Sequence, residues 1–181
     1  PNTGIWQSVW LEFFGEDCIA EHLLLCDYDK TELYGELVTL YGLADEAEIA
    51  VTFDGKLIKR ERLTLRGRHN RYRFALPKDY TDDYSWSPEN PRLLYVDFAI
   101  YKSGKQIDLA YTRVGMRKIS VDEYGKICLN NRPYYQRLVL DQGYWKESGL
   151  TPPSAESLKK DIELAKAMGF NGARKHQKLE D

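Results

Sequence analysis

The 181-residue sequence lacks most features that would identify a function directly. Its net charge is only -2, so no general attraction to nucleic acid or to anionic lipid is expected. No apolar run approaches the roughly 20 residues of a membrane-spanning helix, and we expect a soluble protein. The three cysteines, Cys18, Cys26 and Cys128, lack CxxC spacing, which argues against a zinc site or a disulfide framework. We expect buried thiols, no metal and no cofactor.

The ends of the sequence also lack familiar signals. Residues 1–4 (PNTG) include no initiator methionine, no basic segment and no apolar segment. Residues 169–181 (GFNGARKHQKLED) place an arginine and a histidine after a short strand-like segment, where an α/β enzyme carries functional side chains. We interpret the chain as a piece of a longer protein.

What the sequence does contain, before Gly115, is a repeated pattern of short strands and turns, with a hydrophobic content of 43% that is typical of a globular protein. In residues 48–54 (EIAVTFD) apolar and polar side chains alternate, which indicates a strand covered on one face. Asp54–Gly55 can take positive φ in a tight hairpin, and the next strand begins at about Leu57. The other predicted strands are 22–28, 32–41, 71–76, 93–101 and 106–112.

The alternation in these strands predicts which side chains face a core. The predicted inward residues are Ile49, Val51, Phe53, Tyr72, Phe74, Leu76, Leu94, Val96, Phe98, Ile100, Ile107, Leu109 and Tyr111. Seven short strands without an intervening helix favour a mainly β fold. We predict an antiparallel β-sandwich of the immunoglobulin-like type over residues 13–115.

After Gly115 the pattern changes. Residues 118–135 predict a small hairpin that turns at Tyr124–Gly125, with a second turn at Asn130–Asn131. Residues 136–141 (QRLVLD) contain consecutive apolar residues, which is typical of a parallel strand covered on both faces.

A helix and another strand follow. Ser154 can cap the start of the helix and Gly169 can end it. Residues 171–177 (NGARKHQ) form the next predicted strand. The order strand, helix, strand predicts the first βαβ unit of a (β/α)8 barrel, which is incomplete because such a barrel needs roughly 250 residues. The predicted inner stripe of the helix comprises Leu158, Ile162, Ala165 and Met168.

Four stretches in sequence order carry a resemblance to a known family: residues 3–12 (TGIWQSVWLE), 86–95 (WSPENPRLLY), 115–137 (GMRKISVDEYGKICLNNRPYYQR) and 158–174 (LKKDIELAKAMGFNGAR). In order, they resemble the end of the N-terminal sugar-binding sandwich, the immunoglobulin-like second domain, the entry to the catalytic barrel, and the first barrel helix with the second strand of family 2 glycoside hydrolases. This group contains β-galactosidases, β-glucuronidases and β-mannosidases.

The resemblance implies three domains: residues 1–12 as the last strand of a truncated sugar-binding sandwich, 13–115 as the immunoglobulin-like sandwich, and 116–181 as the start of the catalytic barrel. It also implies a fragment of a retaining glycosidase that acts on oligo- or polysaccharides, in which two glutamates on later barrel strands perform hydrolysis. No glutamate here follows the family's Asn-Glu motif, so we expect no catalytic residue in this chain and no hydrolase activity from the chain alone.

What this chain can supply is part of the wall of the sugar pocket, because active-site residues of barrel enzymes lie at the C-terminal ends of strands. Asp141 and Gln142 end the first strand, and Arg174 and His176 end the second. Trp145 lies in the loop after the first strand and is a candidate for stacking on a sugar. The resemblance places Arg174 where family members carry an arginine at the end of the second strand.

The sequence departs from the galactosidase and glucuronidase branches around these residues. Those branches continue the arginine with Ser-His-Tyr-Pro, whereas Lys175-His176-Gln177 follows it here, and residues 138–145 (LVLDQGYW) stand where they read close to GVNRHEH. The substrate specificity of those branches is therefore not carried over. The structural alternatives are an ion pair for Arg174, a solvated or hydrogen-bonded His176, and a packed lid formed by Tyr144 and Trp145.

Residues 56–73 contain eight lysines and arginines. Because aromatic residues are sparse among them and the whole chain is slightly acidic, we interpret this stretch as the outward face and guarded edge of the sandwich rather than a nucleic-acid surface.

A second hypothesis treats the sandwich as a non-catalytic module that binds carbohydrate or mediates assembly. The βαβ opening favours the glycosidase hypothesis, since a self-sufficient module does not need it. An incomplete barrel also predicts self-association, with residues after about Pro133 either mobile or covered by a second copy. For the longer protein, a periplasmic or secreted location is a family-level expectation only.

Overall fold

The computed structural model describes residue 5 and residues 9–77 and 84–176. The chain divides into two compact units, a larger one that comprises Phe13–Tyr134 and a smaller one that comprises Pro1–Glu12 and Tyr135–Asp181. The small hairpin that precedes the predicted barrel therefore groups with the sandwich.

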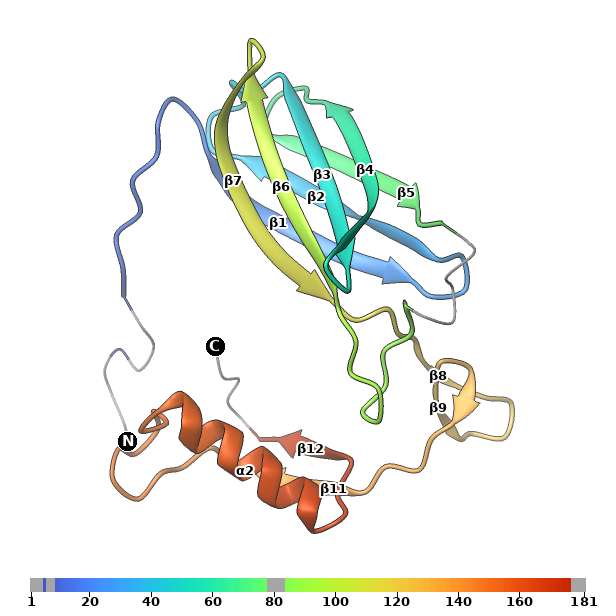
Figure 1. Ribbon diagram of the computed structural model, residues 1–181. Helices are drawn as coiled ribbons and strands as arrows, with labels where there is room; N and C mark the ends of the chain where they lie inside the picture. Colours follow the sequence, from blue (N-terminus) through green and yellow to red (C-terminus); the bar gives the residue numbers. More distant parts are fainter. Residues whose placement is uncertain (1–4, 6–8, 78–83, 177–181) are drawn as a thin grey trace. The chain divides into compact units, whose positions relative to one another are not determined.

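Within the described residues of the larger unit, seven strands form two antiparallel sheets that face one another (Figure 1). The sheets have the strand orders β1-β2-β5 and β4-β3-β6-β7. The prediction of a mainly β fold built on an antiparallel sandwich is confirmed, and each predicted strand is present. The bounds are Ile19–Asp27 for β1, Glu32–Thr39 for β2, Glu46–Phe53 for β3, Lys56–Thr64 for β4, His69–Ala75 for β5, Leu94–Lys102 for β6 and Lys105–Val114 for β7.

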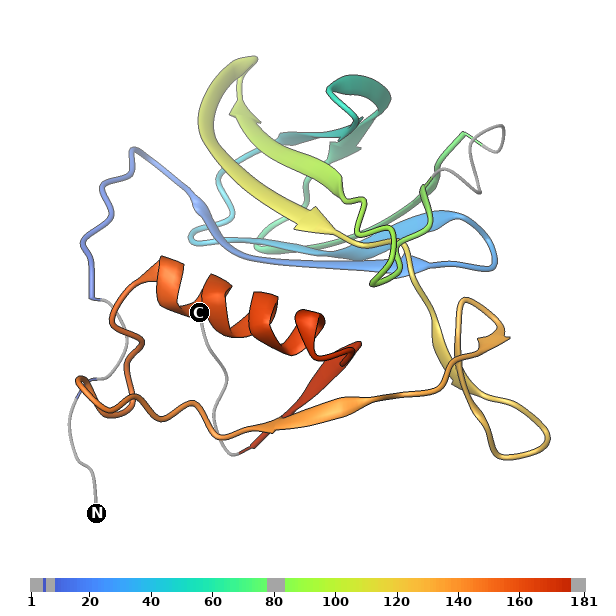
Figure 2. The same cartoon turned by 60° about the horizontal axis from the view of Figure 1, so that its bottom comes forward.

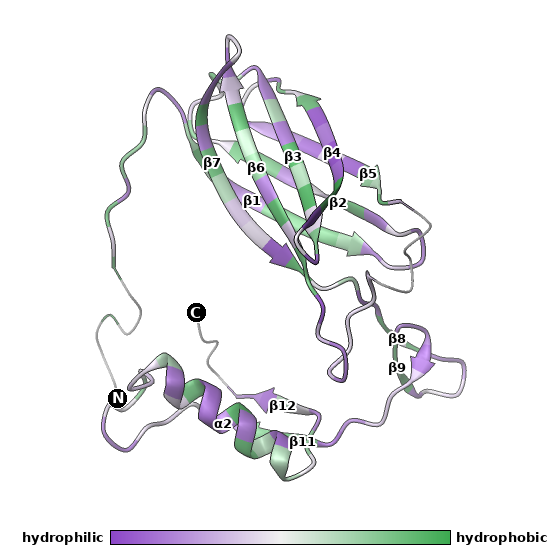
Figure 3. Ribbon diagram, in the orientation of Figure 1, coloured by the Kyte–Doolittle hydropathy of each residue, from purple (hydrophilic) through white to green (hydrophobic). Residues whose placement is uncertain are grey.

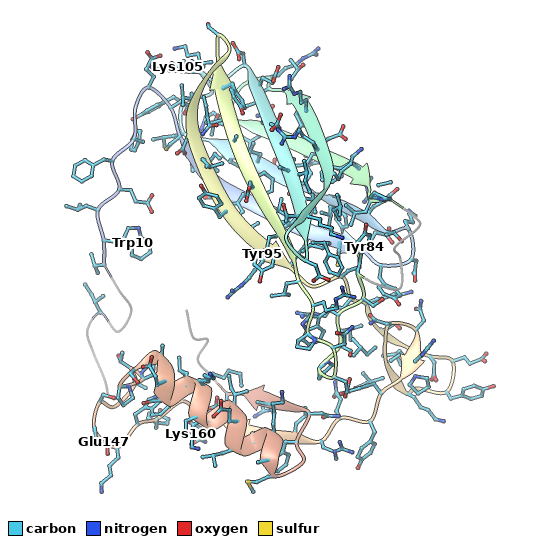
Figure 4. All side chains as sticks on the ribbon, viewed as in Figure 1. Trp10, Tyr84, Tyr95, Lys105, Glu147 and Lys160 are labelled. Carbon is cyan, nitrogen blue, oxygen red and sulfur yellow. The ribbon has the colours of Figure 1, made fainter. Side chains whose placement is uncertain are left out.

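A single hydrophobic core lies between the two sheets. Apolar and polar residues alternate along the strands (Figure 3), so that one face of each sheet is covered and the other is wet. The predicted inward residues of β3, β5 and β6 are all buried, as is Leu76 just beyond β5. Tyr84, which is labelled in Figure 4, packs edge-on against Phe53 with ring centroids 5.1 Å apart.

Strand β7 departs from the predicted alternation. The prediction placed Ile107, Leu109 and Tyr111 on one inward face, but the pairing of β7 with β6 is interrupted by a bulge at Ile107. One extra residue inverts the alternation beyond it. Ala110 and Val114 therefore pack on the core. Leu109 does not, and Tyr111 is 69% exposed, so the predicted inward positions of these two residues were wrong.

The hairpin turns follow from residues that accept positive φ. Asp54 and Gly55 have φ of 49° and 75°, and Ser103 and Gly104 have φ of 50° and 76°. Positive φ at both central residues matches the right-handed twist of the flanking strands. The turn predicted at Asp54–Gly55 is confirmed.

The basic stretch lies mainly on β4, an edge strand, and on β5. Part of its charge is balanced locally: the buried carboxylate of Glu48 accepts from Arg60 at 2.5 Å and from Arg62 at 3.3 Å. Lys59 pairs with Glu61 at 3.1 Å on the same strand. This pairing accords with an outward, protected sheet edge.

A small three-stranded sheet of β8 (Ile119–Val121), β9 (Ile127–Leu129) and β10 (Arg132–Pro133) follows the sandwich. It is attached through Asp29 in the turn after β1, which accepts from Asn131 at 2.8 Å and from Lys118 at 2.5 Å. These two partners hold the pKa of Asp29 below its ordinary value.

Trp86 forms a second joint between the sandwich and this sheet. The indole lies so close to Gly115 that a Cβ there would be 2.9 Å from the ring. The Arg117 guanidinium lies 4.5 Å from the ring centroid, and Asn130 donates to the Trp86 carbonyl at 3.0 Å. Both joints fix the orientation of the hairpin on the sandwich.

The smaller unit contains β11 (Leu138–Asp141), α2 (Ala155–Ala167) and β12 (Gly172–Lys175), with the two strands paired in parallel. The predicted cap is confirmed, since the Ser154 side chain accepts from the Ser157 amide at 3.2 Å. Gly169, with φ of 87°, ends the helix, and the two amides that follow the cap bond back to the carbonyls of Ala165 and Lys166.

Helix α2 lies along one face of the β11–β12 pair (Figure 2), yet no residue of this described helix is buried. Along its predicted stripe Leu158 and Ala165 are half-buried, whereas Ile162 is 62% and Met168 is 75% exposed. The βαβ order is observed, and its continuation into a barrel stays a prediction.

Residue 5 and residues 9–12 form no strand with the described part of the chain, so their assignment to a preceding sandwich stays a prediction. Among the residues that the structure describes, no helix combines the length and apolarity needed to cross a bilayer.

Gly35, at the centre of β2, is expected to be irreplaceable. A Cβ at this position would lie 1.9 Å from the Leu23 carbonyl oxygen and 2.8 Å from the Tyr72 hydroxyl oxygen, which itself donates to Leu23 at 2.7 Å. Gly35→Ala should lower the free energy of unfolding by about 3 kcal/mol through this overlap. Urea unfolding measures the loss, with Gly15→Ala as control because its Cβ would meet nothing within 4 Å. Equal effects of the two substitutions would contradict the steric argument.

Asp17 is buried and holds the segment before β1 to the loop after β2. Its carboxylate accepts from the backbone amides of Cys18 at 3.0 Å, Tyr41 at 2.8 Å, Leu43 at 2.7 Å and Ala44 at 3.2 Å. Burial alone raises the pKa of Asp17, but the four amides together bring it below its ordinary value.

Asp17 should therefore contribute stability that is fully present above its unfolded pKa of about 3.9 and is lost as the pH falls through the lower folded pKa. Asp17→Asn leaves two amide donors facing an NH2 group, and we expect a loss of about 3 kcal/mol at neutral pH. It should also flatten the acid limb of the stability profile. Unfolding titrations from pH 7 to pH 2 test this, with the exposed Glu123→Gln as a control of equal charge change.

Candidate functional site

The carboxyl ends of β11 and β12 meet at one edge of the smaller unit because the strands are parallel. Asp141 pairs with Lys175 in the register, and the His176 amide donates to the Asp141 carbonyl at 2.9 Å. The backbone thus brings together Asp141, Gln142 and His176, three of the residues predicted to line a sugar pocket.

Asn171 fixes this register at the opposite end of the strands. Its side chain accepts from the Arg137 amide at 2.8 Å and donates to the Tyr135 carbonyl at 2.8 Å, while its own amide donates to the Arg137 carbonyl at 3.0 Å. The Arg137 side chain in turn donates to the Gly169 carbonyl at 2.9 Å, at the end of α2. One asparagine therefore aligns both strands, and the arginine links them to the helix.

The strand pair has two different faces, since side chains alternate along each strand. Leu140 is opposite Arg174, and Asp141 is opposite Lys175. Leu140 and Arg174 therefore share one face, and Asp141 and Lys175 share the other. The predicted pocket residues Asp141 and Arg174 project to opposite faces and do not form one cluster.

A groove of about 690 Å³ lies between α2 and the end of β11. The predicted residues Asp141 and Gln142 line it, whereas Trp145, Arg174 and His176 do not. Its walls include Val139 and Ala173 from the strands, Tyr144 from the loop, and Ile162, Ala165 and Met168 from the helix. The groove is mainly apolar, which suits packing between a helix and a sheet better than recognition of a hydrophilic sugar.

Asp141 is engaged by neighbouring protein groups. Its Oδ2 accepts from the Lys175 ammonium at 2.5 Å, and its Oδ1 accepts from the Gly143 amide at 2.8 Å. Gly143 is buried with φ of 66°, a conformation that favours glycine. Lys175 was missed as a site residue; its place between Arg174 and His176, where it pairs with Asp141 in a parallel register, is the signal that could have identified it.

Arg174 is exposed, and its side chain makes no hydrogen bond or ion pair with the residues that the structure describes. The alternative in which an ion pair satisfies it is therefore not seen here. His176 is half-buried, and its backbone amide is the group that anchors it to β11. Both residues remain predicted sugar contacts.

The loop after β11 presents its two aromatic residues differently. Trp145 is half-buried and closes a turn with Gly149 through two backbone bonds of 2.8 and 2.9 Å. Its buried Nε1 has no hydrogen-bond partner in the described part of the chain. Tyr144 is 64% exposed and is the aromatic ring that could stack on a sugar without rearrangement. Glu147, farther along the loop, and Lys160, on α2, are exposed (Figure 4).

Across the described residues there is no group of three or more histidine, cysteine, aspartate or glutamate side chains placed to hold a metal ion. The three free cysteines are half-buried or buried.

No family model matches the sequence, and no curated protein is similar to it by sequence comparison. Solved structures do match. A glycosyl hydrolase family 2 member from Bacteroides cellulosilyticus DSM 14838 is 20% identical with a TM-score of 0.71, over 90% of this chain and 24% of that protein. A family 2 β-galacturonidase from Eisenbergiella tayi bound to galacturonate is 20% identical with a TM-score of 0.70, over 93% of this chain and 30% of that protein.

A third similar structure is the β-glucuronidase of Parabacteroides merdae with glycerol in its active site, which is 13% identical with a TM-score of 0.72, over 91% of this chain and 22% of that protein. At these identities the likeness establishes a shared fold, and it confirms the resemblance to family 2 at that level. The chain spans less than a third of the length of each of these three proteins.

The Asn171 side chain should control the pairing of β11 with β12. Asn171→Ala removes two hydrogen bonds and leaves their backbone partners unsatisfied, so amide hydrogen exchange in residues 136–141 should accelerate roughly tenfold, equivalent to about 1.4 kcal/mol. Gln136→Ala is the matched control, since Gln136 is exposed on the same segment. Unchanged protection in Asn171→Ala would show that the register is set elsewhere.

Proposed function

We propose that the chain is part of a retaining family 2 glycoside hydrolase, in which it supplies the immunoglobulin-like sandwich and the first βαβ unit of a (β/α)8 barrel. The observation that carries this proposal is the order of parts. An antiparallel sandwich, a small hairpin and a parallel βαβ unit follow one another along the chain. Family 2 structures match about nine tenths of the chain in fold, which supports the proposal.

The sheet topology supports the immunoglobulin-like type. Seven strands in sheets of three and four, ordered β1-β2-β5 and β4-β3-β6-β7, fit that architecture when the fourth strand joins the second sheet. The exposed apolar residues Ile5, Val9 and Leu11 support the assignment of residues 1–12 to a strand of a preceding sandwich, where such side chains would find partners.

The composition of β11 supports the barrel. Leu140 is 55% exposed, and by strand alternation it projects to the face opposite that of Val139. A strand that is apolar on both faces requires cover on both, which a closed barrel with outer helices provides. The same uncovered surfaces support self-association of the 181-residue chain.

We infer that the catalytic glutamates belong to barrel strands outside residues 1–181. In a retaining mechanism the two carboxyl groups lie roughly 5–5.5 Å apart and form a covalent glycosyl intermediate. This chain contributes pocket wall: Arg174, with a guanidinium unengaged by described residues, would hydrogen-bond sugar hydroxyl or carboxylate oxygens, and Gln142 and His176 directly follow the ends of β11 and β12. A periplasmic or secreted location would accord with polysaccharide breakdown.

The test is hydrolysis of a panel of nitrophenyl α- and β-glycosides, including galactosides, glucuronides and galacturonides. The protein encoded by the complete reading frame should hydrolyse at least one β-glycoside, and the 181-residue chain should hydrolyse none. In the complete protein, Arg174→Ala should lower kcat/KM roughly 100-fold, while Arg132→Ala, an exposed arginine on β10, should not.

Turnover by the 181-residue chain would refute the assignment of the glutamates. Inactivity of both proteins would favour the alternative, a non-catalytic sandwich that binds carbohydrate or mediates assembly.

A further inference from the structure

The ion pair between Asp141 and Lys175 lies at the ends of β11 and β12, on the opposite face of the strand pair from Arg174. Asp141 ends β11, Lys175 ends β12, and the two are direct neighbours in the parallel register. Their charged atoms are 2.5 Å apart; the Lys175 side chain is 23% exposed and the Asp141 side chain 43% exposed, so solvent is only partly excluded from the pair.

Both oxygens of the Asp141 carboxylate serve the protein itself. Oδ2 accepts from Lys175, and Oδ1 accepts from the Gly143 amide at 2.8 Å. The second bond fixes the turn in which Gly143 adopts its positive φ of 66°, directly after Gln142 and before Tyr144. A side chain held in this way sets the direction in which the loop leaves the strand.

The backbone of Asp141 holds the other strand. Its carbonyl accepts from the His176 amide at 2.9 Å, so the exit of β12 is tied to the same residue. Arg174 and His176 flank Lys175 and, by strand alternation, lie on the opposite face from the ion pair. From this opposite face the ion pair connects the two backbone segments that carry Gln142, Arg174 and His176. We call this connection a brace.

We propose that Asp141 and Lys175 are positioning residues of the sugar pocket. Their ion pair holds the loop after β11 to the end of β12 and so keeps the sugar-contacting side chains in the positions that catalysis requires. This inference rests on the proposed function and revises the role of Asp141, from a sugar contact to a brace. Loss of such a positioning interaction should lower kcat more than it raises KM, because misplacement of the contacts weakens transition-state interactions most.

The kinetic test uses the protein from the complete reading frame with the nitrophenyl glycoside that it hydrolyses. Lys175→Met should lower kcat roughly tenfold with KM changed less than twofold, and Lys175→Arg should restore most of the loss because the charge is kept. Lys159→Met is the matched control: it removes the same charge from an exposed pair with Glu163 on α2, at 3.8 Å, and should leave kcat unchanged.

Asp141→Asn supplies a second, independent variant. The asparagine oxygen can still accept from Gly143, but the charge that attracts Lys175 is gone, so the loss in kcat should match that of Lys175→Met. The double variant should lose no more than either single one, since both remove the same interaction. Multiplicative losses, or a rise in KM at constant kcat, would overturn the proposal and indicate separate contacts with the sugar.

Hydrogen exchange in residues 138–149 gives a readout that is independent of hydrolysis. Lys175→Met and Asp141→Asn should each accelerate it roughly tenfold, and Lys159→Met should not. If the complete protein hydrolyses no glycoside, the proposed function fails while this measurement still shows whether the pair braces the loop. Unchanged exchange in both variants would sink the brace even in an active enzyme.

Discussion

A parallel pair of strands is stable only when apolar side chains on both of its faces are covered. This constraint applies to β11 and β12 of the smaller unit. Helix α2 covers one face of β11 and β12, and the groove beside it shows that even this cover is incomplete. Leu138 and Leu140 project from the other face and are exposed. The sandwich has no such demand, because its two sheets already enclose a core.

The two units therefore differ in what their polar groups do. The sandwich encloses its own core, and its ion pairs, hairpin turns and buried Asp17 stabilise its own structure. The smaller unit leaves apolar side chains of its strands and helix exposed, and the residues proposed to contact sugar lie at the ends of its strands, where a barrel enzyme places chemistry. The brace formed by Asp141 and Lys175 belongs to the smaller unit. The substrate contacts proposed for Arg174 and His176 depend on this brace.

Much of the fold was predictable because period-two alternation and turn residues such as Asp54–Gly55 are local signals. The exchange of inward and outward faces in β7 was not predictable, since no residue in the sequence around Ile107 indicates a bulge. The candidate site was predictable as a location, at the ends of two strands. Its internal geometry was not, because the register decides that Asp141 faces Lys175 rather than joining Arg174, and a register is a long-range property.

Trp86 has a consequence of another kind. Its ring lies against Gly115 on the path from the sandwich to the hairpin, and the Arg117 guanidinium is stacked on it. A charge so close to an indole shifts its excited-state energy, so the emission of this tryptophan is tied to the closed geometry of the joint. With the other three tryptophans (Trp6, Trp10 and Trp145) replaced by phenylalanine, the emission of Trp86 would report a loosening of the joint between sandwich and hairpin.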